Sequence, residues 1–159
     1  MTGDPFAGDP FAGDPFAGLL PAETDSPEAT QALGRRLAAR LRPGDVVALA
    51  GGLGAGKTHL AKGVAEGLGL DPAGVTSPTF TIVHEHDGPA GLVLHLDLYR
   101  IETVVEAARL GLGELLSGEA IALVEWPENA FGLLPLETLW LRLTPLRGDR
   151  RQVERAGTP

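Results

Sequence analysis

The spacing of apolar residues changes several times along the chain, and each change predicts a different element. Leucines recur every fourth residue after Ser26 and Pro27, at Leu33, Leu37 and Leu41. This spacing is typical of one buried face of a helix, and a serine before a proline is a common helix start. The apolar run 46–50 is too short for a helix and predicts a strand buried on both faces. Helical spacing returns from Lys57 to Gly69.

The second half of the chain contains two strand-like segments joined by a short, turn-rich link. They are residues 80–86 and 92–98, and the link has the length of a hairpin connection, which predicts antiparallel pairing. The pattern also predicts a helix at 102–116 interrupted at Gly111 and Gly113, and strands at 121–124 and 138–143. Helices alternating with buried strands predict an α/β fold in three layers, with a mixed central sheet that includes antiparallel strands.

Residues 3–17 consist of three copies of the sequence Gly-Asp-Pro-Phe-Ala. Glycine and proline in every copy disfavour both helix and strand. We therefore expect a disordered tail over residues 1–18 and a single folded domain over residues 19–159. A second interpretation is a multivalent binding motif with three aromatic anchors, Phe6, Phe11 and Phe16. Composition favours the first interpretation.

Composition and charge exclude several classes of function. The chain has 159 residues, 43% of them hydrophobic, which fits one globular domain. The absence of cysteine excludes disulfides, thiolate nucleophiles and cysteine-bound metals. A net charge of −8 disfavours direct binding to nucleic acid. No apolar run is long enough to span a membrane and no signal peptide is visible, so we expect a cytoplasmic protein without membrane contact.

Residues 51–58 read Gly-Gly-Leu-Gly-Ala-Gly-Lys-Thr and satisfy the pattern of a phosphate-binding loop. The loop follows an apolar strand and precedes a helix, a setting in which glycine amides and a helix N-terminus surround phosphate. Lys57 would reach the outer phosphates, and the Thr58 hydroxyl would bind Mg²⁺. The fold is therefore predicted to be a P-loop NTPase. The candidate nucleotide-binding residues are Gly52, Leu53, Gly54, Ala55, Gly56, Lys57, Thr58, His59 and Trp126.

A phosphate-binding loop needs an acidic side chain near the metal, usually at the end of a neighbouring buried strand. Asp97 and Glu125 each end an apolar segment. Both are candidate catalytic residues, and the sequence leaves open which one binds metal and which orients water. Thr79, a third candidate, lies either in a switch that senses the γ-phosphate or in a turn. His95 is either a packed neutral histidine or a partner of Asp97, and Trp126 either stacks on a base or lies in the core.

Four segments taken together resemble the TsaE (YjeE) family, the small ATPases of tRNA threonylcarbamoyladenosine biosynthesis. The segments are residues 51–58, 77–81, 95–100 and 124–127, and the likeness spans about residues 24–156. The resemblance implies a P-loop α/β domain that binds ATP with Mg²⁺ and acts with the TsaB and TsaD subunits. TsaD then makes the modified adenosine, and tRNA is reached only indirectly through the complex. A preference for adenine over guanine also agrees with the sequence, which lacks the Asn/Thr-Lys-x-Asp motif that guanine-specific P-loop proteins usually carry.

The resemblance assigns roles to individual residues. It implies that Lys57 and Thr58 bind phosphate and metal, and that Glu125 is the Walker B acid and a metal ligand. It further implies that Asp97 is a second acid needed for hydrolysis and that Thr79 belongs to the switch.

Two positions depart from the family pattern. Gly52 stands where an aspartate is usual, and His59 stands where a second threonine is usual, while the phosphate-contacting positions survive. The alternative function is a compact P-loop small-molecule kinase whose C-terminal arginines close over ATP. A further alternative is an assembly factor that binds ATP and barely hydrolyses it. The sequence offers no acceptor-binding group of residues, and the arginine-rich C-terminal segment is interpreted more simply as a solvated terminus.

Overall fold

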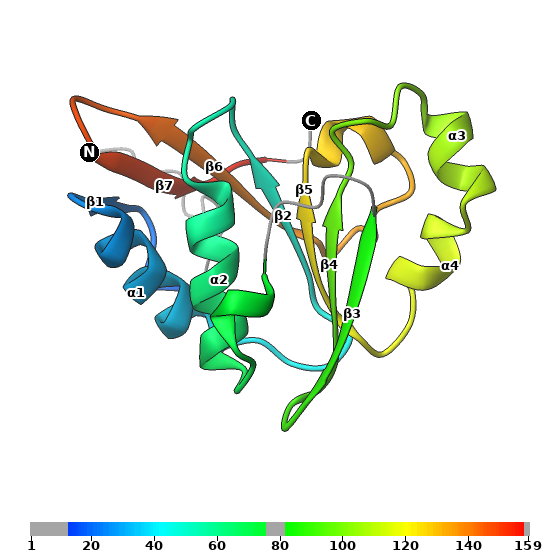
Figure 1. Cartoon of the computed structure of the whole chain (residues 1–159), viewed down its shortest axis with the longest axis horizontal. Helices are drawn as coiled ribbons and strands as arrows, with labels where there is room; N and C mark the ends of the chain where they lie inside the picture. Colours follow the sequence, from blue (N-terminus) through cyan, green and yellow to red (C-terminus); the bar gives the residue numbers. More distant parts are fainter. Residues whose placement is uncertain (1–12, 76–81, 158–159) are drawn as a thin grey trace, which may run out of the picture.

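The computed structural model describes residues 13–75 and 82–157, which fold around a seven-stranded sheet in the order β1-β7-β6-β2-β5-β4-β3 (Figure 1). The strands are β1 (Ala22–Thr24), β2 (Val46–Ala50), β3 (Val83–Gly88), β4 (Gly91–Asp97), β5 (Ile121–Glu125), β6 (Leu139–Pro145) and β7 (Arg151–Arg155). The helices are α1 (Pro27–Ala38), α2 (Lys57–Gly67), α3 (Val104–Arg109) and α4 (Leu112–Leu116), with short 3-10 turns η1 (Pro72–Gly74) and η2 (Pro127–Ala130).

The central strands of the sheet are parallel and its edges are antiparallel. β2 pairs in parallel with both β5 and β6, and β4 pairs in parallel with β5. β3 forms a hairpin with β4, while β7 and β1 extend the opposite edge. This arrangement confirms the predicted α/β fold with a mixed sheet. Because the central strands run in one direction, their carboxyl ends meet at one edge, where Glu125 lies between Asp97 and Leu49.

Helices cover both faces of the sheet and bury two apolar clusters. One cluster lies under α1 and α2 and contains Val47 and Leu49 of β2. The other lies under α3 and α4 and contains Val46 of β2 and Leu94 of β4. Successive residues of β2 thus point to opposite faces, as the pleat of a strand requires. Burial on both faces explains why the run 46–50 is apolar throughout.

α1 and α2 lie unusually close together because glycines stand at their contact. α1 begins as predicted, with Ser26 Oγ accepting the Ala29 N–H at 3.0 Å. A β-carbon placed on Gly34 would lie 2.4 Å from the Leu60 carbonyl oxygen, and one on Gly63 would lie 1.9 Å from the Gln31 carbonyl oxygen. Neither approach is possible with a larger residue, so these glycines set the distance between the helices.

The predicted helix over 102–116 is two short helices in the structure. Gly111 separates them in a left-handed conformation with φ of 75°, which glycine adopts without strain. The expected second interruption at Gly113 is wrong, because this residue lies inside α4. Thr103 caps α3 by accepting the Glu106 N–H at 3.1 Å.

The two strands β1 and β7 were not predicted from the sequence. The arginine-rich segment expected to be a solvated terminus forms β7, which pairs with β6 on one side and β1 on the other. Val153 is its one fully buried residue, so the strand lacks an apolar pattern. Within the described part of the chain, no helix is long and apolar enough to cross a membrane.

The packed part of the chain extends beyond the domain boundary expected at residue 19. Phe16, in the last copy of the repeat, is 6% exposed and joins the apolar cluster under α1 and α2. Leu19 is buried in the same cluster. The first two copies of the repeat lie outside the described residues.

Candidate functional site

The glycine-rich loop connects the carboxyl end of β2 to the first turn of α2, at the centre of the sheet. Gly54 has φ of 72° and Gly56 has φ of 96°, values that favour glycine. The loop therefore curls back over the start of α2, and Gly56 is the residue that precedes its first turn. The unpaired amide groups at the N-terminus of α2 face this loop and favour negative charge.

Lys57 is held inside the loop although its side chain carries a charge. It is 6% exposed, and its Nζ donates to the Gly51 carbonyl oxygen. The ammonium also lies 3.5 Å from the ring centroid of Trp126. Burial lowers the pKa of Lys57, and the nearby carboxylates of Glu125, Glu128 and Asp97 oppose this change only in part. The lysine is thus a cation whose charge is incompletely compensated.

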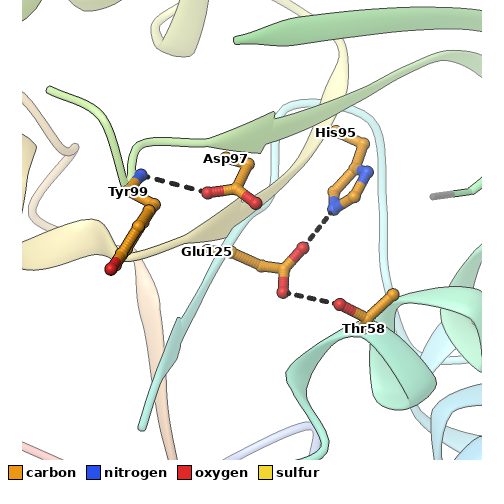
Figure 2. A network of polar contacts seen from close by, with 5 residues as sticks. All are labelled: Thr58, His95, Asp97, Tyr99 and Glu125. Atoms are coloured by element: carbon orange, nitrogen blue, oxygen red, sulfur yellow. Dashed lines mark hydrogen bonds and ion pairs between the residues drawn. The ribbon is translucent and has the colours of Figure 1, made fainter. Parts of the chain in front are cut away.

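Glu125, at the end of β5, is the centre of the polar contacts (Figure 2). Its Oε1 accepts the Thr58 hydroxyl at 3.1 Å, and its Oε2 lies 2.7 Å from His95 Nε2. The side chains of His95 and Glu125 are 1% and 3% exposed. Because a carboxylate oxygen accepts, the Nε2 of the histidine donates, and its buried Nδ1 has no hydrogen-bond partner among the residues that the structure describes.

Of the two interpretations of His95, the pairing with Asp97 is wrong, because the histidine contacts Glu125 of the neighbouring strand instead. Parallel pairing places Glu125 beside Asp97, and the glutamate side chain reaches back to His95. Asp97 is 8% exposed, and its Oδ1 accepts the Tyr99 backbone N–H at 3.0 Å, in the turn that follows β4. The structure thus separates the two acids by their contacts: Glu125 touches the Thr58 hydroxyl, whereas Asp97 bonds to the backbone.

Trp126 occupies a position that links the loop to the protein surface. Its backbone is left-handed, with φ of 56°, and Pro127 follows directly. The Lys57 ammonium lies over the indole, and the Tyr99 ring centroid is 4.9 Å from that of the indole. Tyr99 is 55% exposed, so the aromatic pair reaches solvent. Trp126 therefore belongs to the site rather than only to the core.

A cavity of about 390 Å³ lies over the loop. The residues that line it are Pro27, Thr30, Leu53, Gly54, Ala55, Gly56, Lys57, Thr58, His59, Glu125, Trp126, Asp149 and Arg151. The sequence-predicted nucleotide-binding residues are all among them except Gly52, and Asp97 lies outside this lining. Thr79 falls in residues 76–81, outside the described part of the chain.

Sequence reasoning missed the part of the cavity wall that α1 supplies, and it placed the C-terminal arginines near the nucleotide only in the kinase alternative. Arg151 donates to the Gly54 carbonyl oxygen at 3.1 Å and to the Gly148 carbonyl oxygen at 2.9 Å. Its interpretation as a solvated terminal residue was wrong, because β7 returns the chain to the loop. The only sequence signal was the cluster of arginines near the C-terminus.

Fold and site together define a class of protein: an α/β protein with a glycine-rich loop, a buried lysine and a buried carboxylate at the carboxyl edge of a mixed sheet. The family model of threonylcarbamoyl adenosine biosynthesis protein TsaE matches residues 24–153. With that match covering most of its length, the chain belongs to the TsaE family.

Individual relatives agree with this assignment. The chain is 42% identical over 130 residues to tRNA threonylcarbamoyladenosine biosynthesis protein TsaE of Bacillus subtilis, a match that covers 82% of this chain and 80% of the relative. The protein of the same name from Streptomyces coelicolor is 46% identical over 122 residues, covering 74% and 80%. The crystal structure of Bacillus subtilis YdiB matches with a TM-score of 0.71 at 37% identity, covering 88% of this chain and 86% of that one.

Proposed function

We propose that this chain is a P-loop ATPase subunit that binds ATP with Mg²⁺ and serves tRNA threonylcarbamoyladenosine biosynthesis together with TsaB and TsaD. One observation carries the proposal: the buried Glu125 carboxylate touches the Thr58 hydroxyl directly behind a glycine-rich loop that contains Lys57. A hydroxyl and a carboxylate at this point of a loop-helix junction are oxygen ligands of the kind that Mg²⁺ prefers.

The residues present fit a magnesium nucleotide in charge as well as in shape. The loop offers backbone amides and a helix N-terminus to phosphate, and the cavity of about 390 Å³ lies over it. Nearby carboxylates compensate the charge of Lys57 only in part. Its ammonium would move from the Gly51 carbonyl oxygen to the phosphate oxygens. ATP supplies the transferable phosphoryl group when bound. Thr58 and Glu125 would hold the metal, which leaves Asp97 as the candidate for orienting water.

The remaining wall of the cavity suits the sugar and base. Pro27 and Thr30 of α1 and Arg151 of β7 line the cavity together with the loop. Trp126 and His59 add aromatic surface beside the same cavity. We assign adenine to this side, and Thr79 remains the predicted switch residue. In the complex, tRNA would be reached through the partner subunits, which agrees with the net charge of −8 on this chain.

The test is nucleotide affinity and hydrolysis in two variants. Lys57→Ala removes the phosphate-binding charge and should weaken ATP binding by roughly 10- to 100-fold, the equivalent of one charge-assisted hydrogen bond. Glu125→Gln should keep most nucleotide affinity but lose the Mg²⁺ dependence of binding and the hydrolysis measured with TsaB and TsaD. Lys62→Ala, on the same helix but outside the cavity lining, is the matched control. Unchanged ATP affinity in Lys57→Ala would refute the site.

A further inference from the structure

The third copy of the Gly-Asp-Pro-Phe-Ala repeat, residues 13–17, is seated on the domain by its phenylalanine. The Phe16 ring is 6% exposed and packs into the apolar cluster under α1 and α2. The Phe16 N–H donates to Asp14 Oδ1 at 3.0 Å, and the Ala17 N–H donates to the Asp14 carbonyl oxygen at 3.1 Å. These two bonds fold the copy into a compact turn with the ring inside.

Two arginines from distant parts of the chain hold the polar groups of this turn. Arg155, at the end of β7, pairs with the Asp14 carboxylate, whose side chain is 6% exposed. Burial alone would raise the pKa of Asp14, but a backbone hydrogen bond and the pairing with Arg155 outweigh it and hold the pKa below its ordinary value. Arg40, just beyond α1, donates to the Pro15 carbonyl oxygen at 2.7 Å and to the Ala17 carbonyl oxygen at 2.9 Å.

All of these contacts are made to groups that the other two copies also possess. Residues 3–7 and 8–12 have the same five residues as residues 13–17, and each copy is followed by glycine. A five-residue shift of the tail would present the same ring, carboxylate and carbonyl groups to the domain. The shift expels five residues as a short loop before Leu19, and closing such a loop costs less than an aromatic side chain gains by burial.

We propose that Arg40, Arg155 and the apolar seat of Phe16 form a docking site for the sequence Gly-Asp-Pro-Phe-Ala, in which residues 8–12 of the same chain replace residues 13–17 when the third copy is displaced. The copies of the repeat are then interchangeable docking segments of the same chain rather than parts of a uniform tail. The occupant comes from the same chain because a copy tethered a few residues away has a far higher effective concentration than a copy on another molecule.

The test compares thermal unfolding of full-length variants at the three repeated phenylalanines. The triple variant Phe6→Ala/Phe11→Ala/Phe16→Ala has no intact copy and should lower Tm by roughly 6–20 °C. Phe16→Ala alone should lose less than half as much, because the second copy takes the seat. Phe131→Ala, at a phenylalanine that is 44% exposed, controls for loss of an aromatic ring elsewhere. A second comparison, of Asp14→Asn with the triple variant Asp4→Asn/Asp9→Asn/Asp14→Asn, repeats the test with a milder change.

Hydrogen exchange identifies the occupant directly. In the unmodified chain the Ala17 amide should be protected by its bond to Asp14, and in Phe16→Ala the protection should move five residues back, to Ala12. Equal losses of Tm in the single and triple variants would overturn the proposal, as would a triple variant as stable as the unmodified chain. A concentration-dependent dimer of Phe16→Ala in sedimentation would also overturn it, since the occupant would then come from another molecule.

Discussion

Replacing His95 by leucine tests whether the histidine holds Glu125 in place. The bond from Nε2 to the glutamate is 2.7 Å long, and both side chains are almost fully buried. Losing a hydrogen bond to a buried charged group costs about 1.5–3 kcal/mol. Leucine also removes the unpartnered Nδ1, whose burial is itself unfavourable, so part of the loss is offset. We therefore expect a net loss of about 1–2 kcal/mol, or roughly 2–8 °C in Tm.

The assay is urea unfolding in magnesium-free buffer, arranged as a double-mutant cycle with Glu125→Leu, which removes both carboxylate oxygens. If the two side chains act as a pair, their coupling energy should exceed about 1 kcal/mol, because each single change already breaks the same bond. His95→Gln, which keeps an amide donor, should recover part of the stability lost in His95→Leu. The histidine should also show the Nε2–H tautomer in nitrogen-15 NMR spectra. Additive effects of the two substitutions, or an Nδ1–H tautomer, would refute this account.

Two further predictions concern a half-buried histidine and the glycines of two helices. Burial, together with the neighbouring His84 and His95, lowers the pKa of His86 below its ordinary value of 6.5. The unfolded chain therefore binds the proton more tightly than the folded chain, and the stability should fall as the pH drops below about 6.5. The difference in unfolding free energy between the unmodified chain and His86→Gln should therefore shrink between pH 7.5 and 5.5, and a constant difference would contradict this. Gly63→Ala should lose more than about 3 kcal/mol in chemical denaturation, because the new β-carbon meets backbone of α1. Gly113→Ala, inside α4, places its β-carbon in ordinary contact with the Leu133 side chain at 3.9 Å and should be neutral or slightly stabilising, and equal losses would disprove the packing argument.

Local sequence patterns predicted the centre of this fold well. The apolar runs that form β2 and β5 are short, uninterrupted and bounded by turn residues. Their strand structure therefore follows from the local sequence pattern. Helical spacing predicted the helix after the glycine-rich loop, and a short turn-rich link predicted the hairpin of β3 and β4. The likeness to the TsaE family, which four short segments carried, is confirmed by the family match over residues 24–153.

The parts that sequence did not predict depend on contacts between distant residues. β1 is a short edge strand and β7 is the strand next to it, and they pair although about 130 residues separate Ala22 from Val153. The same return of the chain brings Arg151 to the glycine-rich loop. Phe16 lies in a glycine- and proline-rich repeat, whose composition suggests disorder. Its burial requires the apolar cluster under α1 and α2, and Asp14 beside it pairs with Arg155 of β7; no local pattern reveals these contacts.

The contact between Lys57 and the Trp126 ring gives the molecule a built-in optical reporter. The chain has two tryptophans, and only Trp126 lies beside the cavity, under a charged ammonium at 3.5 Å. Trp140 is buried in β6 and pairs with Ala48 of the central strand. A ligand that draws the ammonium off the indole changes the surroundings of one emitter and leaves the other as an internal reference. Occupancy of this cavity can thus be followed by intrinsic fluorescence without any label.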